Sequence, residues 1–119
     1  MMAHAEDTAL RHFLQEIRAQ LGERLRRVIL FGSRARGDDV SGSDYDCLVV
    51  VDRNSPEILN AIDEVTGEIL FQHNAVFSVF TISEERHRRP TYDPFLSNVR
   101  KEGIVLWAQE ESSAPNWRQ

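Results

Sequence analysis

The sequence predicts a single two-layer domain of the α+β or α/β class, in which helices pack on a small sheet. Its 119 residues match the usual length of one domain. Short apolar runs at 28–31, 47–51 and 75–82 have the length and composition of buried strands. Segments with apolar residues at helical spacing lie among these runs, and helical crossovers between short strands indicate a two-layer domain.

The first helix is predicted from Thr8 to Leu21, because apolar residues recur there every three or four positions. Gly22 follows where a helix would end, and the helix is expected to pack on the sheet. A basic group then leads into the first strand at Val28, and it is more typical of a solvated junction than of a binding patch. It consists of Arg24, Arg26 and Arg27.

The second helix is expected after Ser55, an N-cap residue, with Pro56 at its first position and an end near Gln72. It joins the second strand to the third, which is predicted over 75–82.

A last helix is predicted to start at Asp93-Pro94 and to stop at Gly103, before a short edge strand at 104–107. The polar run from Glu84 to Tyr92 is more typical of a solvated loop or a loose helical turn than of a segment that binds nucleotide or a partner. Residues 109–119 are polar and are expected to be a disordered tail, in which Trp117 is either a remnant of the terminus or a residue that docks on a partner.

A glycine-rich turn after the first strand is the centre of the functional prediction. Gly32 allows the backbone to approach a ligand closely, and Gly37 suits the left-handed end of a short helix. Ser33 is placed to cap that helix, whose free N–H groups would face an anion such as phosphate. Arg36, with Arg34 nearby, adds guanidinium charge that suits phosphate.

The spacing of Gly32 and Gly37 equals that of a phosphate-binding P-loop, but the rest of that motif is missing. A P-loop continues with lysine and then serine or threonine. Asp38 and Asp39 occupy those positions here and would repel phosphate. The P-loop is therefore excluded.

Two aspartates, Asp44 and Asp46, open the second apolar run. Residues two apart on a strand point to one face, with about 6.6 Å between their backbone positions. Carboxylates this close repel each other unless a cation lies between them. Mg²⁺ is commonly held by one or two carboxylates together with substrate phosphates. The stretch therefore indicates metal-assisted transfer at a phosphorus centre.

These residues resemble the signature of the DNA polymerase β nucleotidyltransferase superfamily, and most closely its small prokaryotic members, the minimal nucleotidyltransferases (MNT). That signature is a Gly-Ser pair at a strand end, a spacer, and Asp-x-Asp between hydrophobic residues. It appears here as Gly32-Ser33, residues 34–43 and Asp44-Tyr45-Asp46-Cys47. Ala-Arg-Gly at 35–37, Ser43 and the closing segment 98–106 also match. The resemblance covers about residues 8–107 of a single domain spanning 1–119.

The resemblance implies the nucleotidyltransferase (DNA polymerase β-like) fold, a small mixed sheet with helices packed against it and a site open at one sheet edge. It assigns Gly32 and Ser33 to the nucleotide triphosphate, with ATP as substrate, and Asp44 and Asp46 to Mg²⁺. Arg36 is assigned, on position alone, to charge stabilisation.

The superfamily usually adds a third carboxylate on the next strand, which completes a two-metal site and can act as general base. This chain has Ser78 at the corresponding position. Serine is a poor base and a weak metal ligand, while phosphoryl transfer depends mainly on positioning and charge neutralisation. Slow transfer with one metal ion and nucleotide binding without turnover therefore both stay open.

Two functional hypotheses follow. In the first, the chain is an enzyme that transfers a nucleoside monophosphate, AMP from ATP, to a hydroxyl of another protein and releases pyrophosphate. The resemblance implies that this partner is a HEPN-domain protein, often the toxin of a toxin–antitoxin pair, in a hetero-oligomer. In the second, the chain is a weak or inactive MNT-like subunit that neutralises such a partner by binding. A DNA- or RNA-modifying transferase is a weaker third option.

The composition of the chain argues against several kinds of binding site and of cellular location. The net charge of −5 argues against general nucleic-acid binding, which depends on cationic neutralisation of phosphates. The single cysteine, Cys47, lies in an apolar run and is expected to be a core residue in a reducing compartment. The four histidines show no zinc-ligand spacing. No apolar run approaches the length of a membrane span and no secretory pattern is present, so a cytoplasmic protein is expected.

Overall fold

The structure, a computed structural model, describes residues 7–37, 44–89 and 92–109. Some sequence-based expectations fall outside this part of the chain. They concern Ser43, the acidic residues Asp38 and Asp39, and the tail with Trp117.

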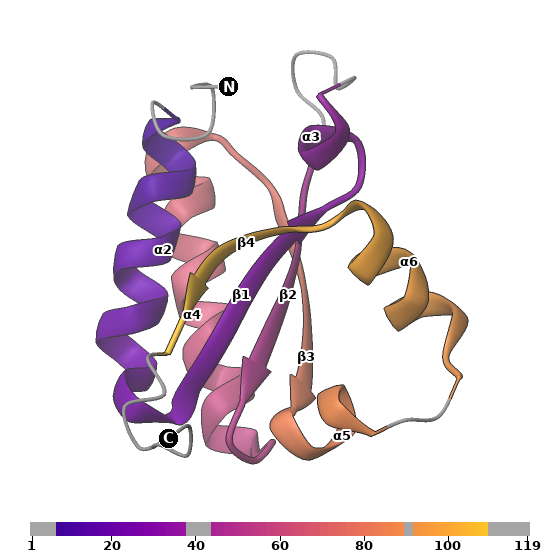
Figure 1. The fold of residues 1–119 in the computed structure, drawn as a ribbon. Helices are drawn as coiled ribbons and strands as arrows, with labels where there is room; N and C mark the ends of the chain where they lie inside the picture. The colour runs from indigo at the N-terminus through magenta and orange to yellow at the C-terminus, as the bar shows by residue number, and fades with distance from the viewer. Residues whose placement is uncertain (1–6, 38–43, 90–91, 110–119) are drawn as a thin grey trace, which may run out of the picture.

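Four strands form one sheet in the order β3-β2-β1-β4 (Figure 1). The strands are β1 (Leu25–Phe31), β2 (Tyr45–Val51), β3 (Phe77–Ser83) and β4 (Ile104–Ala108). β2 and β3 are parallel, whereas β1 pairs antiparallel with both β2 and β4. The sheet is therefore mixed, and the predicted α+β fold class is confirmed.

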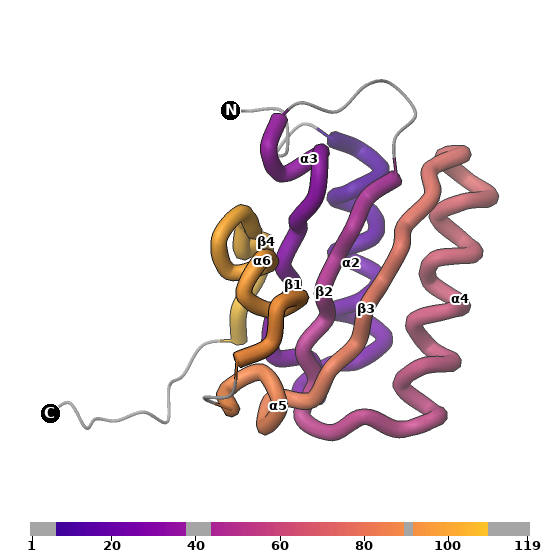
Figure 2. The backbone as a smooth tube through the Cα atoms, turned by 90° about the vertical axis from the view of Figure 1, so that its right-hand side faces the viewer, coloured from indigo at the N-terminus to yellow at the C-terminus, as the bar shows by residue number. Residues whose placement is uncertain are grey.

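Helices cover both faces of this sheet, so α6 adds a third layer to the two layers that the sequence predicted (Figure 2). Helices α2 and α4 lie side by side on one face, and the shorter α6 lies on the other. The helices are α2 (Thr8–Leu21), η1 (Gly22–Arg24, a 3₁₀ turn), α3 (Ser33–Arg36), α4 (Pro56–His73), α5 (Glu84–Arg88) and α6 (Pro94–Glu102). The caps expected at Ser55 and Asp93 are present, since each side chain accepts a hydrogen bond from a backbone N–H of the first turn.

Each face of the sheet has its own core, because side chains alternate along a strand. On the α2/α4 face, the Phe13 ring is fully buried and stacks on Phe77 with centroids 4.3 Å apart. Cys47 belongs to this core, and burial raises the pKa of its thiol above the ordinary value. On the other face, Leu96 and Val99 of α6 pack on a smaller core. Helix α6 therefore approaches the sheet on the face that carries Asp46, since Asp46 alternates with Cys47.

Several strand boundaries differ from the prediction, and β3 runs over Phe77–Ser83 rather than over 75–82. β1 begins at Leu25 rather than Val28, because Leu25 is fully buried and pairs with Val51. The arginines around it are half-buried, and two of them form ion pairs, Arg24 with Asp52 at 3.6 Å and Arg26 with Glu84 at 3.8 Å. At the other end, Gln109 continues the pairing of β4, because its N–H donates to the carbonyl of Arg26 at 2.9 Å. Gln109 is thus part of the fold rather than of a loose tail.

The polar run after β3 contains a short helix, α5, in which the basic side chains have acidic neighbours. Arg88 pairs with Glu84 at 3.2 Å, and Arg89 with Glu85 at 3.2 Å. Charges neutralised within one helical turn support the interpretation of this run as a solvated face.

Lowering the pH is expected to weaken the fold through His87 of α5. Burial, followed by the charges of Arg27 and Arg100, lowers the pKa of His87 below its ordinary value of 6.5. Arg88 acts in the same direction, and Glu84 opposes it. Between the lowered pKa and 6.5, the unfolded chain binds more protons than the folded protein, so stability rises with pH and is lost as the pH falls.

Urea denaturation at a series of pH values measures this effect. The free energy of unfolding should fall as the pH drops through about 6.5, and His87→Gln should make that fall shallower. Identical pH profiles for the two proteins would contradict the assignment.

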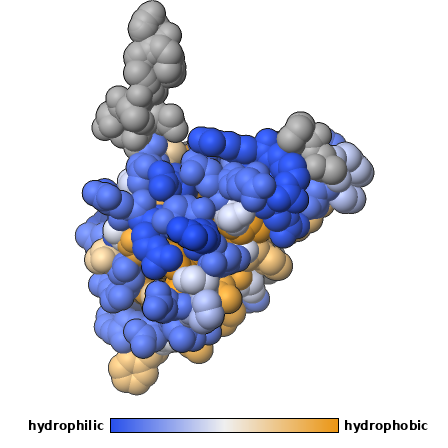
Figure 3. Space-filling view, turned by 90° about the horizontal axis from the view of Figure 1, so that it is seen from below, coloured by the Kyte–Doolittle hydropathy of each residue, from blue (hydrophilic) through white to orange (hydrophobic). Residues whose placement is uncertain are grey.

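None of the described helices is long and apolar enough to cross a membrane. Viewed from below, the surface is mainly hydrophilic, with smaller hydrophobic areas between the polar side chains (Figure 3).

Candidate active site

The turn at the end of β1 has a backbone conformation that requires glycine. Gly32 has φ 79° and ψ −162°, a region in which essentially only glycine is found. Gly32 itself is the N-cap of α3, and Ser33 is the first helical residue, so the expected capping by the Ser33 side chain is wrong. Gly37 ends α3 in the left-handed conformation (φ 83°), as expected, and its N–H donates to the carbonyl of Ser33.

Asp46 lies directly against this turn. A Cβ atom at position 32 would overlap Oδ2 of Asp46, so glycine is needed both for the backbone and for the space that the carboxylate occupies. Asp46 stands opposite Phe31 on β1 and opposite Ser78 on β3. Asp46 therefore lies on a central strand of the sheet, at the end of that strand over which the Gly32 turn passes.

Asp44 precedes β2, is exposed, and lies near Asp46. Partial burial raises the pKa of Asp46 above its ordinary value, and the negative charges of Asp44 and then Glu102 raise it further. The unfavourable charge of this group is what a bound cation would relieve. Carboxylate oxygens are the ligands that Mg²⁺ prefers, so the residues fit this ion. Within the described ranges no three His, Cys, Asp or Glu side chains form a ready-made metal site, and the fit depends on Asp44, Asp46 and oxygens of a substrate.

Glu102, at the end of α6, contacts the candidate site, and no local sequence pattern indicated this. Its Oε2 accepts the N–H of Gly32 at 3.1 Å, and its Oε1 accepts from Nη1 of Arg36 at 2.9 Å. The amide of Asn98 also donates to Oε2 at 3.4 Å. Only 17% of the Glu102 side chain is exposed. Glu102 thus links α6 to both the Gly32 turn and α3.

The two arginines of α3 point to different faces of the sheet. Arg36 pairs with Glu102, on the face that carries Asp46. The guanidinium of Arg34 lies 3.9 Å from the centre of the Tyr45 ring, which belongs to the α2/α4 core. The Tyr45 hydroxyl donates to Asp7 at 2.6 Å, so this side of the turn is tied to the start of α2. Arg36 is the arginine on the side of the acids.

Ser78 lies beside Asp46 on the neighbouring parallel strand, where the sequence placed the expected third carboxylate. Next along the same face comes Phe80, with 46% of its surface exposed. Its ring packs against Phe95 and Phe31, with centroids 5.1 and 5.9 Å apart respectively. An aromatic surface therefore borders the acids, and it could not be predicted from local sequence patterns, because Phe95 reaches it from α6.

A scan against family models finds the nucleotidyltransferase domain over residues 10–106. The chain belongs to this family. A relative from Methanocaldococcus jannaschii, named "Putative protein adenylyltransferase", is 30% identical over 102 residues, which are 86% of this chain and 98% of the relative.

The nucleotidyltransferase domain also resembles solved toxin–antitoxin structures. One is a chain of a toxin–antitoxin crystal structure with AMP-PNP, with a TM-score of 0.59 and 18% identity over 82% of this chain and 73% of that chain. Another comes from the Shewanella oneidensis complex of a tri-AMPylated HEPN toxin with an MNT antitoxin, with a TM-score of 0.55 and 17% identity over 83% and 69% of the two chains. At these identities the likeness shows a common fold.

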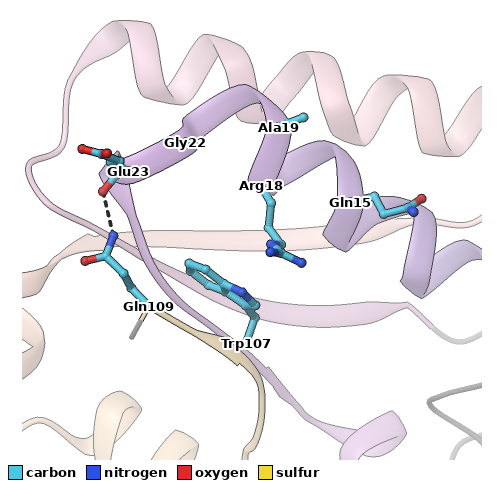
Figure 4. Close-up of a pocket in the computed structure, with 7 residues that line it drawn as sticks. All are labelled: Gln15, Arg18, Ala19, Gly22, Glu23, Trp107 and Gln109. Atoms are coloured by element: carbon cyan, nitrogen blue, oxygen red, sulfur yellow. Dashed lines mark hydrogen bonds between the residues drawn. The ribbon is translucent and has the colours of Figure 1, made fainter. Parts of the chain in front are cut away.

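A separate hollow of about 520 Å³ lies in this nucleotidyltransferase domain where the end of α2 meets β4. Trp107 forms its floor, and the guanidinium of Arg18 lies 5.2 Å from the centre of a Trp107 ring (Figure 4). The Gln109 amide, at the rim, donates to the carbonyl of Glu23 at 3.0 Å. None of the predicted site residues lines this hollow.

Proposed function

We propose that this protein is a Mg²⁺-dependent nucleotidyltransferase that transfers AMP from ATP to a hydroxyl group of a partner protein. The observation that supports it best is the contact of Asp46 with the Gly32 turn, with Asp44 nearby. In this proposal Gly32 and Ser33 receive the triphosphate, and Asp44 and Asp46 hold the metal ion. When bound, Mg²⁺ would supply positive charge between the carboxylates and the phosphates.

The reaction needs positioning more than covalent participation of the protein. The acceptor oxygen forms a bond to the α-phosphorus of ATP while the bond to the bridging oxygen of pyrophosphate breaks, and the hydroxyl proton leaves to solvent or to a carboxylate. Arg36 stabilises negative charge on the phosphates, and Glu102 holds Arg36 toward the turn. The half-exposed Phe80 surface offers an apolar face on which a base could stack.

The partner is the second part of the proposal. One solved complex of similar fold combines an MNT antitoxin with a tri-AMPylated HEPN toxin. We propose a HEPN-type protein as acceptor and partner, in the cytoplasm, with this chain as the antitoxin. The net charge of −5 supports a protein partner over nucleic acid.

Labelled ATP tests the transfer. The protein is incubated with Mg²⁺ and with the product of the adjacent open reading frame as candidate partner, using ATP labelled at the α-phosphate in one reaction and at the γ-phosphate in another. Label on the partner from the α position alone is the expected result. Transfer from the γ position would indicate a kinase, and no transfer from either would contradict nucleotidyl transfer.

Ser78 favours a second candidate, a binding subunit that neutralises its partner without turnover. A hydroxyl stands beside Asp46 where a carboxylate would complete a two-metal site. In this case, neutralisation of the partner should survive the loss of both Asp44 and Asp46. Neutralisation that disappears with the aspartates supports the enzyme instead.

Glu102→Gln is expected to reduce transfer about tenfold, by analogy with residues that orient the groups holding a metal or substrate. Glutamine keeps an oxygen for the Gly32 N–H but loses the charge that holds Arg36. Glu102→Ala loses both and should reduce transfer further. Glu57→Gln, an exposed glutamate on α4, is the matched control and should leave the rate unchanged; equal rates for all four proteins would contradict the role of Glu102.

A further inference from the structure

The structure brings together two histidines that are 61 positions apart in the sequence. His12 lies on α2 and His73 is the last residue of α4, and Nδ1 of His12 is 2.9 Å from Nε2 of His73. The rings are steeply inclined, at 73°, with centroids 5.1 Å apart. Both side chains are partly exposed, at the edge where the two helices pack together on the sheet.

We propose that His12 and His73 form a binding site for a divalent transition-metal ion such as Zn²⁺. Imidazole nitrogens bind Zn²⁺ at about 2.0–2.1 Å, and a tetrahedral angle then separates two such nitrogens by about 3.3 Å. The same geometry places the ring centroids about 5 Å apart. The observed pair needs an opening of only a few tenths of an ångström, within reach of small side-chain rotations.

The surroundings orient the rings for this role. A carboxylate oxygen of Glu16 lies 3.8 Å from Nε2 of His12, the nitrogen that faces away from His73. A carboxylate beside the outer nitrogen favours the proton there, as in many metal-binding histidines, so Nδ1 of His12 accepts the hydrogen bond from Nε2 of His73 and has its lone pair on the side that the ion would occupy. In the metal-free protein the 2.9 Å contact is a hydrogen bond, so one inner nitrogen carries a proton, which moves to the outer nitrogen of the same ring when the ion binds.

Charge at this edge also favours a cation. A hollow of about 290 Å³ beside His12 is lined by three glutamates, Glu16, Glu64 and Glu68. His73 stands at the C-terminus of α4, where the helix dipole is negative. Among the described residues, His12 and His73 are the protein ligands proposed for the ion, and water molecules would complete its coordination shell.

The nitrogen ligands separate this site from the carboxylates near Gly32. Imidazole suits Zn²⁺, Cu²⁺ and Ni²⁺, whereas Mg²⁺ prefers oxygen. The ion would join α2 to α4 and stabilise the folded protein by mass action. The proposal is independent of nucleotide transfer, since neither histidine lies on the face that carries Asp46.

Zn²⁺ titration of the full chain, without an affinity tag and in excess Mg²⁺, tests the site. Calorimetry should detect one Zn²⁺ ion, and saturating Zn²⁺ should raise the melting temperature by several degrees. His12→Gln and His73→Gln should each weaken binding at least tenfold and remove the thermal shift. Circular dichroism without metal shows whether each variant is folded.

Two controls exclude other binding positions. His87→Gln removes a histidine from α5, and Asp44→Asn/Asp46→Asn removes the acids of the candidate active site; both proteins should bind Zn²⁺ like the wild type. Absence of Zn²⁺ binding by the wild type, or equal binding by His12→Gln and His73→Gln, would overturn the proposal.

Discussion

Gly32→Ala is expected to abolish Mg²⁺-dependent nucleotide binding and to destabilise the domain. The φ of 79° and ψ of −162° cost an alanine about 1–3 kcal/mol. The new methyl group would also overlap Oδ2 of Asp46. Either the turn or the carboxylate must move, and both belong to the proposed site. Thermal unfolding with and without ATP and Mg²⁺ measures the two effects together.

Gly37→Ala is the matched control for this variant. Gly37 also has a positive φ, 83°, but a Cβ atom there meets no other atom within 4 Å among the described residues. This variant should therefore carry the backbone penalty without displacing Asp46, and should keep a thermal shift with ATP and Mg²⁺. A Gly32→Ala protein that still shows the wild-type nucleotide shift would contradict the proposed role of the turn.

Asp46→Asn is expected to reduce AMP transfer by about 100-fold or more, because loss of charge stabilisation worth several kcal/mol has this effect on a rate. The stability of the metal-free protein should not fall together with the rate. The raised pKa of Asp46 means that its ionised form is disfavoured in the folded protein without metal. Stability from this group is present below its unfolded pKa and is lost as the pH rises through the folded value, so near neutral pH asparagine should not destabilise the apo protein.

A loss of transfer without a loss of stability separates a catalytic effect from simple unfolding. Asp63→Asn, an exposed aspartate on α4, should change neither transfer nor the melting temperature. Measurement of labelled AMP on the partner, alongside thermal unfolding of each variant, distinguishes the cases. Undiminished transfer by Asp46→Asn would remove Asp46 from the mechanism.

The elements that follow local rules could be predicted from the sequence. Helix α2 repeats its apolar residues at helical spacing, and the caps at Ser55 and Asp93 depend on neighbours within three positions. The Gly-Ser and Asp-x-Asp pattern indicated the family, because its residues lie close together in the chain. The start of β1 was missed, because Leu25 is buried by a partner on β2 rather than by its own neighbours.

The remaining site features depend on contacts between distant residues. Glu102 meets Gly32 across 70 positions, and His12 meets His73 across 61. A glutamate before Gly103 at a helix end gives no local sign of such a contact. Spacing rules for metal ligands fail in the same way when the two histidines lie on separate helices.

The central claim is that the acids on β2 and the Gly32 turn together hold a metal–nucleotide complex. Calorimetric titration with a non-hydrolysable ATP analogue, in Mg²⁺ and then in EDTA, tests it most directly on the wild type and on Asp44→Asn/Asp46→Asn. The wild type should bind much more tightly in Mg²⁺, and the double variant should bind equally weakly in both buffers. Equal affinity of the wild type in Mg²⁺ and in EDTA, or an unchanged Mg²⁺ effect in the double variant, would contradict the claim.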